Sequence, residues 1–340
     1  VAQRGTSTTG FSSSTATYVT DRFFTVANNY GTYTLTQETD SPDDFQHSFK
    51  IDCTTADASP DASDYLFFHH RLEGQELQIL NYGSSSAKTM TLSFYVKSNK
   101  TGNGSVGFLQ TNNSFKHQSH QYTINSANTW ERKSVTIVGD TSGVINDTVD
   151  RGFEIEFFLG GGTTYTSGSH QTTWTALSNG NRGASNLTIG TSTDDFWSIT
   201  GIQLEIGQNE TGFEHEPFER TLTKCRRYYH KIDSSDSIYQ RVAQGQAYTN
   251  DDATVYIHLF PEMRGVPTLD YGTLSNLGVG TSNFTAKSIG SLSIDSNTDG
   301  TNTCTLNAFD IADDALSAGD VVQMFGNNST DAYIAFKAEL

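Results

Sequence analysis

The sequence predicts an all-β protein with two domains, a β-sandwich followed by a second, smaller β-domain. Three observations lead to this fold class. Short segments of alternating apolar and polar residues recur about every dozen residues, turn-forming residues separate them, and no helical pattern is long enough to connect parallel strands. At 340 residues the chain exceeds one average domain, which favours two.

In the first domain, Met90–Lys97 is the clearest expected strand, because apolar and β-branched residues alternate there with polar ones. The segment 65–80 fits helical and strand spacing almost equally, so both remain open, and the Gly-, Ser-, Thr- and Asn-rich segment 159–190 is expected to be a long loop. The other expected strands are Tyr18–Val26, Tyr30–Leu35, Phe45–Cys53, Ser105–Gln110, Gln121–Ile124, Glu131–Val138 and Gly152–Leu159.

The stretch 197–229 organises the rest of the chain. Its first part alternates as a strand that closes a sheet, with a bulge at Gly201. Turn formers follow from Gly207 to Pro217, and a short helical pattern over 219–229 places Leu222 and Cys225 on one face. We place the domain boundary after this turn, which gives domains 1–223 and 224–340.

The second domain contains a further series of expected strands. These are Ser237–Val242, Ala253–Phe260, Pro267–Tyr271, Phe284–Ile289, Ser291–Ile294, Asn302–Ala308, Val321–Phe325 and Ala332–Ala338.

The charge and the cysteines exclude several classes of function. A formal net charge of −17 argues against nucleic acid, since phosphate contacts need Lys and Arg. No apolar run approaches the length of a membrane span, so membrane insertion is not expected. Cys53, Cys225 and Cys304 lie far apart without zinc-ligand spacing, and we expect them to be small buried side chains.

The sequence gives no support for catalysis. Adjacent acids such as Asp43-Asp44 and Asp194-Asp195 point in different directions on a strand or loop, whereas a glycosidase needs two opposed carboxylates. His117 and His120 are most simply surface residues. We therefore expect no enzyme activity and no cofactor, and a structural calcium ion held by loop carboxylates stays open as an alternative.

Sugar binding is the activity that the residue types favour. Proteins hold neutral sugars against an aromatic face flanked by hydrogen-bonding side chains. In the loop 159–190 this mixture is offered by Tyr165, Trp174, Asn179, Asn181 and Arg182, which are the glycan-binding candidates. Packing at the end of the sandwich is the alternative role for Trp174, and we expect Trp130 and Trp197 to be structural.

Several motifs in a fixed order resemble a known family. They are VAQRGT at Val1, YVTDRF at Tyr18, LSFYVKS at Leu92, TWER at Thr129, GIQLEIG…GFEHEPFERTLTKCRRYY from Gly201, FPEMRGVPT at Phe260 and FKAEL at Phe336. This series is similar to phage tail-fibre and related virion proteins, in which a carbohydrate-binding-module-like jelly roll joins a small C-terminal β-domain. The resemblance implies an interdomain hinge made by Phe213, His215, Pro217, Phe218, Tyr228 and Tyr229.

The resemblance also implies a function. We expect a non-enzymatic protein of the virion surface, in a tail fibre, spike or head decoration, that forms a homotrimer and contacts host surface glycans and neighbouring virion proteins. The alternatives are a capsid cement without a ligand and the binding module of a polysaccharide-degrading enzyme.

Overall fold

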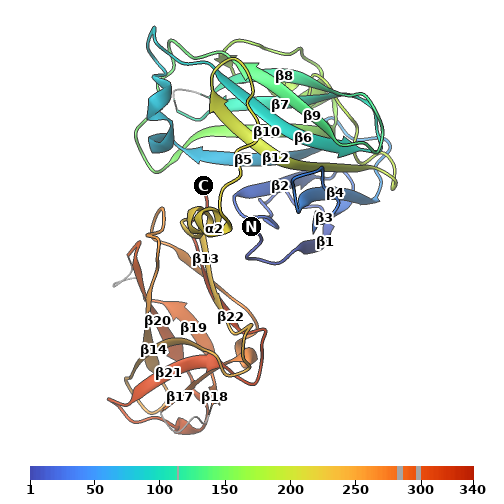
Figure 1. Cartoon of the computed structure of the whole chain (residues 1–340). Coiled ribbons are helices and arrows are strands. Elements are labelled where there is room, and N and C mark those ends of the chain that lie inside the picture. Colours follow the sequence, from blue (N-terminus) through green and yellow to red (C-terminus); the bar gives the residue numbers. More distant parts are fainter. Residues whose placement is uncertain (113–114, 282–285, 296–299) are drawn as a thin grey trace. The chain divides into compact units, whose positions relative to one another are not determined.

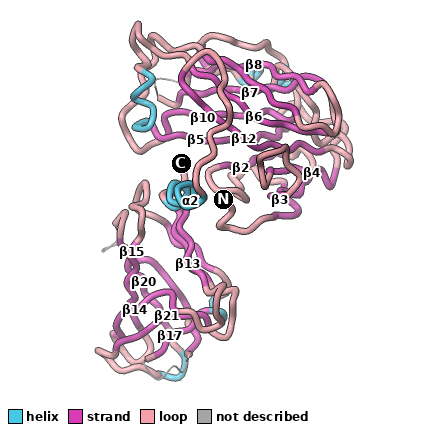
Figure 2. Tube along the Cα trace, in the orientation of Figure 1, coloured by secondary structure: helices cyan, strands magenta, loops and turns pink. Residues whose placement is uncertain are grey.

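The computed structural model describes residues 1–112, 115–281, 286–295 and 300–340. The chain divides into two compact units, residues 2–215 and residues 216–339 (Figure 1). Strands and loops make up most of both units, and the helices are short (Figure 2). The predicted all-β fold class is confirmed. The division between the units precedes helix α2 (Phe218–Arg226), whereas the boundary expected from the sequence lies within that helix.

The first unit is a jelly-roll sandwich of two antiparallel sheets. The first sheet has the order β1 (Ser7–Phe11), β3 (Thr32–Glu38), β4 (Ser48–Thr55), β12 (Phe196–Ile206), β6 (Met90–Ser98) and β9 (Glu131–Ile137). The second sheet has the order β11 (Thr175–Ala176), β8 (Lys116–Ile124), β7 (Gly102–Gln110), β10 (Arg151–Gly161), β5 (Tyr65–Glu73) and β2 (Phe23–Asn28). Each sheet combines strands from distant parts of the chain.

Aromatic side chains fill the space between these two sheets. Phe94 of β6 meets Phe157 of β10 edge-on, with ring centroids 5.0 Å apart. Trp197 of β12 is fully buried, and its Nε1 donates a hydrogen bond of 3.1 Å to the Tyr122 hydroxyl of β8. Burial of large aromatic groups dominates core energetics, so these cross-sheet contacts hold the sandwich together. The structural role expected for Trp197 is confirmed.

Strand β12 lies inside the first sheet and not at its edge. Trp197 pairs with Ile51 of β4 on one side and with Ser98 of β6 on the other. The expectation that this strand closes a sheet is therefore wrong, because both of its edges are hydrogen-bonded. The expected bulge is confirmed: the register with β6 shifts between Thr200 and Gln203, and Gly201 has a φ of +59°.

Most predicted strands of the first unit are present, with shifted ends. The ambiguous segment 65–80 is a strand followed by a 3-10 helix, β5 and then η1 (Gly74–Leu80). The strand expected from Tyr18 starts only at Phe23, since Arg22 has a positive φ. The sequence missed β1. The expected long loop contains the short elements α1 (Thr163–Thr166), β11 and η2 (Asn179–Asn181).

The second unit contains two more antiparallel sheets. The smaller has the order β13 (Tyr229–Asp233), β22 (Tyr333–Lys337) and β16 (Thr268–Tyr271). The larger has the order β18 (Lys287–Ser288), β17 (Leu277–Gly280), β21 (Val321–Gly326), β14 (Arg241–Ala247), β15 (Ala253–His258), β20 (Thr303–Phe309) and β19 (Ser291–Ile294). Two short 3-10 helices are η3 (Leu274–Asn276) and η4 (Ala312–Asp314).

A separate core of aliphatic residues lies in the second unit, with Val255, Leu306 and Met324 fully buried. The sequence missed β13 and β17. Of the strand expected over 284–289, Phe284 and Thr285 lie outside the described residues.

The three cysteines are buried, as expected. No helix in the described part of the chain is long and apolar enough to span a bilayer.

Replacement of Phe157 by Ala is expected to lower the free energy of unfolding by about 3–5 kcal/mol, since it leaves a cavity against Phe94 and Trp197. Urea denaturation of the full chain, followed by tryptophan fluorescence, measures this loss. Ile79→Ala is the control, because Ile79 is 60% exposed and its truncation should change stability by less than about 0.5 kcal/mol. Equal losses for both variants would contradict the described core.

Candidate functional site

A hollow of about 490 Å³ lies on the outer face of the first sheet of the sandwich. We call it the aromatic hollow. Its lining residues are Asp44, Phe45, Tyr95, Arg132, Gly212, Phe213 and His215. All of them belong to the first unit.

The sheet register places the floor of the aromatic hollow. Alternation along β6 buries Phe94 in the core and turns Tyr95 to the outer face. In the ladder, Tyr95 stands between Thr200 of β12 and Arg132 of β9. The Arg132 guanidinium carbon lies 5.9 Å from the centre of the Tyr95 ring, so a cation and an aromatic face are neighbours here.

Glycine at position 201 makes room for the aromatic wall. A Cβ atom at this position would lie 2.7 Å from Phe45 Cζ and 3.0 Å from Tyr95 Cδ2. Phe45 in turn contacts Tyr95, Phe213 and His215, with ring centroids 5.3, 4.9 and 5.2 Å apart. The bulge read from the sequence therefore has a second role, since it lets Phe45 approach the sheet.

The segment after β12 folds back and forms the other wall. The Glu205 carboxylate accepts hydrogen bonds from the Thr211 backbone N–H (2.9 Å) and hydroxyl (3.0 Å). Gln203 Oε1 accepts one from the Glu214 N–H at 2.8 Å. Arg132 donates to the Thr211 carbonyl. These contacts fix the backbone on both sides of Phe213, so the wall is held by hydrogen bonds and not only by ring packing.

Several polar groups of the hollow keep their hydrogen-bonding capacity. Within the described residues, the Asp44 carboxylate, the Tyr95 hydroxyl and the His215 ring have no hydrogen-bond or ion-pair partner, and Arg132 Nε and Nη1 have none either. The hollow thus combines three apolar ring faces with free donors and acceptors. This is the set of groups that a sugar ring requires.

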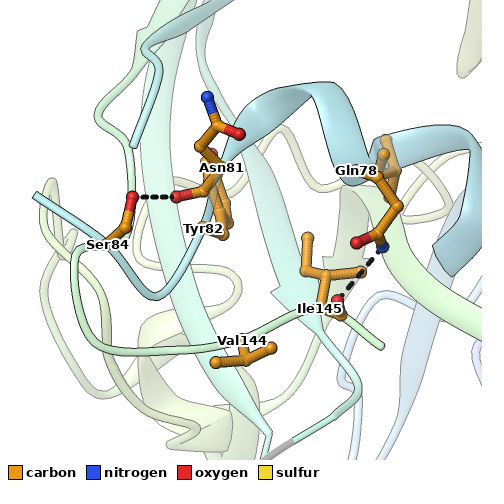
Figure 3. A pocket seen from close by; sticks show the side chains of 7 residues that line it. Gln78, Asn81, Tyr82, Ser84, Val144 and Ile145 are labelled. Atoms are coloured by element: carbon orange, nitrogen blue, oxygen red, sulfur yellow. Dashed lines mark hydrogen bonds between the residues drawn. The ribbon is translucent and has the colours of Figure 1, made fainter. Parts of the chain in front are cut away.

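A second hollow, of about 290 Å³, lies between η1 and the loop 144–145 (Figure 3). Leu77, Tyr82 and Ile145 form its buried apolar part. Figure 3 shows Gln78 donating to the Ile145 carbonyl and Ser84 donating to the Asn81 carbonyl, at 3.1 and 2.7 Å. Because these donors already serve the fold, this hollow is less suited to a polar ligand than the aromatic hollow.

Tyr165 and Trp174, two of the glycan-binding candidates, lie apart. Tyr165 on α1 packs against Phe67 and Phe158, whereas Trp174 packs against Tyr82 and Phe153 and donates a 2.7 Å hydrogen bond to the Val138 carbonyl. Phe153 and Phe158 stand five residues apart on β10, which corresponds to about 16 Å along a strand. The structure does not bring these two rings to one site.

The remaining candidates, Asn179, Asn181 and Arg182, lie on η2 and just after it. Asn179 is exposed, and Asn181 Oδ1 accepts a hydrogen bond of 3.2 Å from the Ser169 N–H. Arg182 binds the buried carboxylate of Glu156 through Nε and Nη2, at 2.8 and 2.6 Å, so its fork is fully engaged inside the protein.

Glu156 belongs to a buried charge cluster on the second sheet. Glu154 is paired with His69 (2.7 Å), Arg71 (3.1 Å) and Arg151 (2.8 Å). Burial by itself would raise the pKa of Glu154, but the charges of His69 and Arg71 outweigh it and hold the pKa at about 2. The pKa of Glu156 is likewise held well below its usual range, since Arg182 outweighs the effect of burial.

His117 also belongs to this cluster, 3.3 Å from Glu156 and 1% exposed. The expectation of a surface histidine is wrong, because β8 turns this side chain toward the buried carboxylate. His120 is half-buried, and burial, together with His170, lowers its pKa to about 4.

The same cluster does not fit a metal ion. His69, Glu154 and Glu156 offer ligand atoms within 4.8 Å of one another. Arg71, Arg151 and Arg182 already supply positive charge to both carboxylates, however, and calcium takes six to eight oxygen ligands. A further cation here would be repelled.

The six residues expected at a hinge fall into two groups. Phe213 and His215 line the aromatic hollow, and the sequence pointed to them only through the family resemblance. Pro217 caps α2, and Phe218 begins it with 65% of its surface exposed. Tyr228 and Tyr229 are buried in the second unit. Sequence reasoning missed Phe45, Tyr95 and Arg132. Tyr95 and Arg132 become neighbours only through the sheet register, and Phe45 approaches them from the loop before β4.

No protein family and no curated protein matches this chain. Solved structures show similarity at low TM-scores. The enzymatically active domain of tailspike protein 4 from bacteriophage CBA120 is 14% identical with a TM-score of 0.32, and the match covers 55% of this chain and 19% of the tailspike chain. The family 11 carbohydrate-binding module from Clostridium thermocellum is 9% identical with a TM-score of 0.29, and the match covers 62% of this chain and all of the module.

A third similar structure contains the CBM22-1 and GH10 modules of xylanase 10B from Clostridium thermocellum. It is 13% identical with a TM-score of 0.30, and the match covers 55% of this chain and 26% of the xylanase chain. The function proposed below rests on the residues of the aromatic hollow.

Replacement of Arg182 by Gln is expected to lower the free energy of unfolding by about 3–5 kcal/mol at neutral pH, because it leaves the buried Glu156 without its main partner. Urea denaturation measures this loss. The matched control is Arg220→Gln, which removes an exposed Arg–Glu pair and should cost less than about 1 kcal/mol.

The difference in the free energy of unfolding between the wild type and the Arg182→Gln variant should become smaller as the pH falls. The pKa of Glu156 in the folded protein lies below its ordinary value of 4.5, so the stabilisation is complete above that pH and is lost as the pH falls toward the folded pKa. Denaturation repeated between pH 7 and pH 3 checks this trend, and a difference that stays constant would contradict it.

Proposed function

We propose that this chain is a non-catalytic, glycan-binding protein of a phage virion surface, and that the sugar binds in the aromatic hollow. The glycan proposal rests on one observation. The aromatic rings of Phe45, Tyr95 and Phe213 lie in one hollow with the polar groups of Asp44, Arg132 and His215.

The two faces of a sugar ring explain why this set suits a glycan. Its C–H groups form an apolar patch that stacks on an aromatic ring, and its hydroxyls need donors and acceptors at the rim. The volume of about 490 Å³ leaves room for more than one sugar ring, and the hollow lies on an outer sheet face. A segment of a longer glycan is therefore the ligand that fits.

The charge distribution supports binding without hydrolysis. Glycosidases use two carboxyl groups on opposite sides of the bond, one of them with a raised pKa. Among the described lining residues of the hollow, Asp44 is the single carboxylate. The buried carboxylates Glu154 and Glu156 have lowered pKa values, which is the opposite of what a catalytic acid needs.

The virion part of the proposal is supported by the ordered series of motifs, which runs from Val1 to Leu340. In this setting the protein acts in a tail fibre, spike or head decoration, as a homotrimer that contacts other virion proteins and host surface glycans. A trimer would present three hollows together, and several weak sites on one particle raise the avidity.

Truncation of the aromatic wall is expected to weaken glycan binding. Phe45→Ala and Phe213→Ala each remove one ring face and should raise the dissociation constant of the bound glycan about 10- to 100-fold, as for other central aromatic contacts. Glycan arrays identify the ligand and calorimetry measures its affinity. Tyr248→Ala is the control, because this aromatic side chain is 62% exposed in the second unit. An equal loss in the control would contradict a site at the hollow.

Substitution at Gly201 tests the geometry of the same site. A Cβ atom at this position would collide with Phe45 and would also strain a residue with a φ of +59°. Gly201→Ala is therefore expected to displace Phe45 and to weaken binding, which calorimetry measures. Gly5→Ala also has a positive φ but meets no atom within 4 Å, so unchanged binding in that variant separates the collision from general backbone strain.

Two further measurements address the alternatives. Release of reducing ends from a bound polysaccharide, abolished by one carboxylate substitution, would contradict a non-catalytic role. Blank glycan arrays together with normal assembly on particles would favour a capsid cement. Electron microscopy of labelled particles distinguishes a tail position from a head position.

A further inference from the structure

We infer that the aromatic hollow selects glycans that carry an anionic substituent, and that Arg132 binds this group. This inference rests on the proposed function and specifies its ligand class.

Arg132 differs from four other arginines of the sandwich in what it binds. Arg71 and Arg151 both bind Glu154, and Arg182 binds Glu156. The Arg4 side chain binds Asp21. In contrast, the described contacts of Arg132 are with the Thr211 carbonyl and, at 3.4 Å, with the Ser93 hydroxyl. In a chain with 38 acidic and 21 basic residues, a guanidinium in an aromatic hollow that forms no ion pair with a carboxylate of the described residues is a group prepared for an external anion.

The guanidinium is also held in position. Its Nη2 is bound to the folded-back segment, and its central carbon lies 5.9 Å from the centre of the Tyr95 ring. Nε and Nη1, for which the described residues provide no partner, remain available as donors. With Nη2 engaged, Nε and Nη1 each offer a single charge-assisted hydrogen bond to a carboxylate or a sulfate, and a guanidinium that is already oriented loses little conformational freedom when it donates it.

Two acids near Arg132 define where an anionic group can bind. Asp44 lines the same hollow but does not come within the 4 Å ion-pair distance of Arg132, and both side chains belong to the described residues. Glu210 is fully exposed, and its carboxylate is bound by its own backbone N–H and by Ser134, while Arg132 contributes a weaker attraction. The anionic group of the sugar is therefore expected at Arg132, with neutral hydroxyls toward Asp44.

Carboxylated and sulfated glycans share this chemistry, and a glycan array that carries neutral, carboxylated and sulfated glycans separates them. The full-length protein is applied to the array, and the best carboxylated binder is then compared by calorimetry with its carboxyl-reduced form. We expect binding of charged glycans, with at least about a tenfold preference over the reduced form. If only sulfated glycans bind, the anionic preference stands and the substituent is sulfate; the desulfated form then replaces the reduced form.

Variants at the two charged positions should have opposite effects. Arg132→Gln is expected to abolish the preference for the charged form, and Asp44→Asn is expected to strengthen binding of the charged form several-fold because it removes a repulsion. Arg132→Lys keeps the positive charge but lacks the planar guanidinium, and it should retain part of the preference for the charged glycan. If the glutamine and lysine variants both lose binding of charged and neutral forms alike, Arg132 acts by holding the loop, and the inference is wrong. Arg220→Gln, which removes a positive charge of the second unit, is the control.

The outcomes separate the two proposals. Binding of neutral glycans alone, or equal affinity for charged and reduced forms, overturns the anionic preference and leaves glycan binding intact. An array without any binder, with the protein folded by circular dichroism, overturns glycan binding itself.

Discussion

Hydrogen bonding of β12 on both edges is the constraint on which the first unit depends. Because the strand is fixed between β4 and β6, its alternation puts Trp197 into the core and Thr200 onto the outer face. Beyond the bulge at Gly201 the strand continues beside β6 to Ile206, and the segment that follows Gly207 then returns over the sheet. The core and the aromatic hollow thus lie on the two faces of the sheet that contains β12, and a shift in the register of this strand would disturb both.

Charge is used differently on the two sheets. On the second sheet, Glu154 and Glu156 are buried and fully paired, which costs desolvation energy but binds the loop that carries Arg182 to the sheet. On the first sheet, Arg132 and Asp44 remain accessible and unpaired with each other within the described residues. The paired charges of the second sheet stabilise the fold, whereas Arg132 and Asp44 on the first sheet can interact with a charged or polar ligand.

A binding surface of this kind suits a protein whose work is adhesion. Rings that pack against one another lose little freedom on binding, and the hydrogen bonds of Glu205 and Gln203 hold the segment that carries Phe213 before a ligand arrives. The second unit has its own aliphatic core, and the described residues that line the hollow all belong to the first unit. A modest affinity in each hollow would be sufficient where many copies act together on a particle.

The sequence by itself determined the all-β class, most strands and the bulge at Gly201, because alternation and glycine are local signals. Burial of the cysteines also followed from residue type, and the structural role of Trp197 followed from a strand pattern that resembles core positions of the family. Only the tertiary structure decided the place of β12 in its sheet and the partners of His117 and Arg182. It also assembled the hollow, in which Phe45, Tyr95, Arg132 and Phe213 come from four distant segments. Strand register brings Tyr95 and Arg132 together, and two loops then carry Phe45 and Phe213 to them. Register depends on pairing between distant strands that no local pattern records.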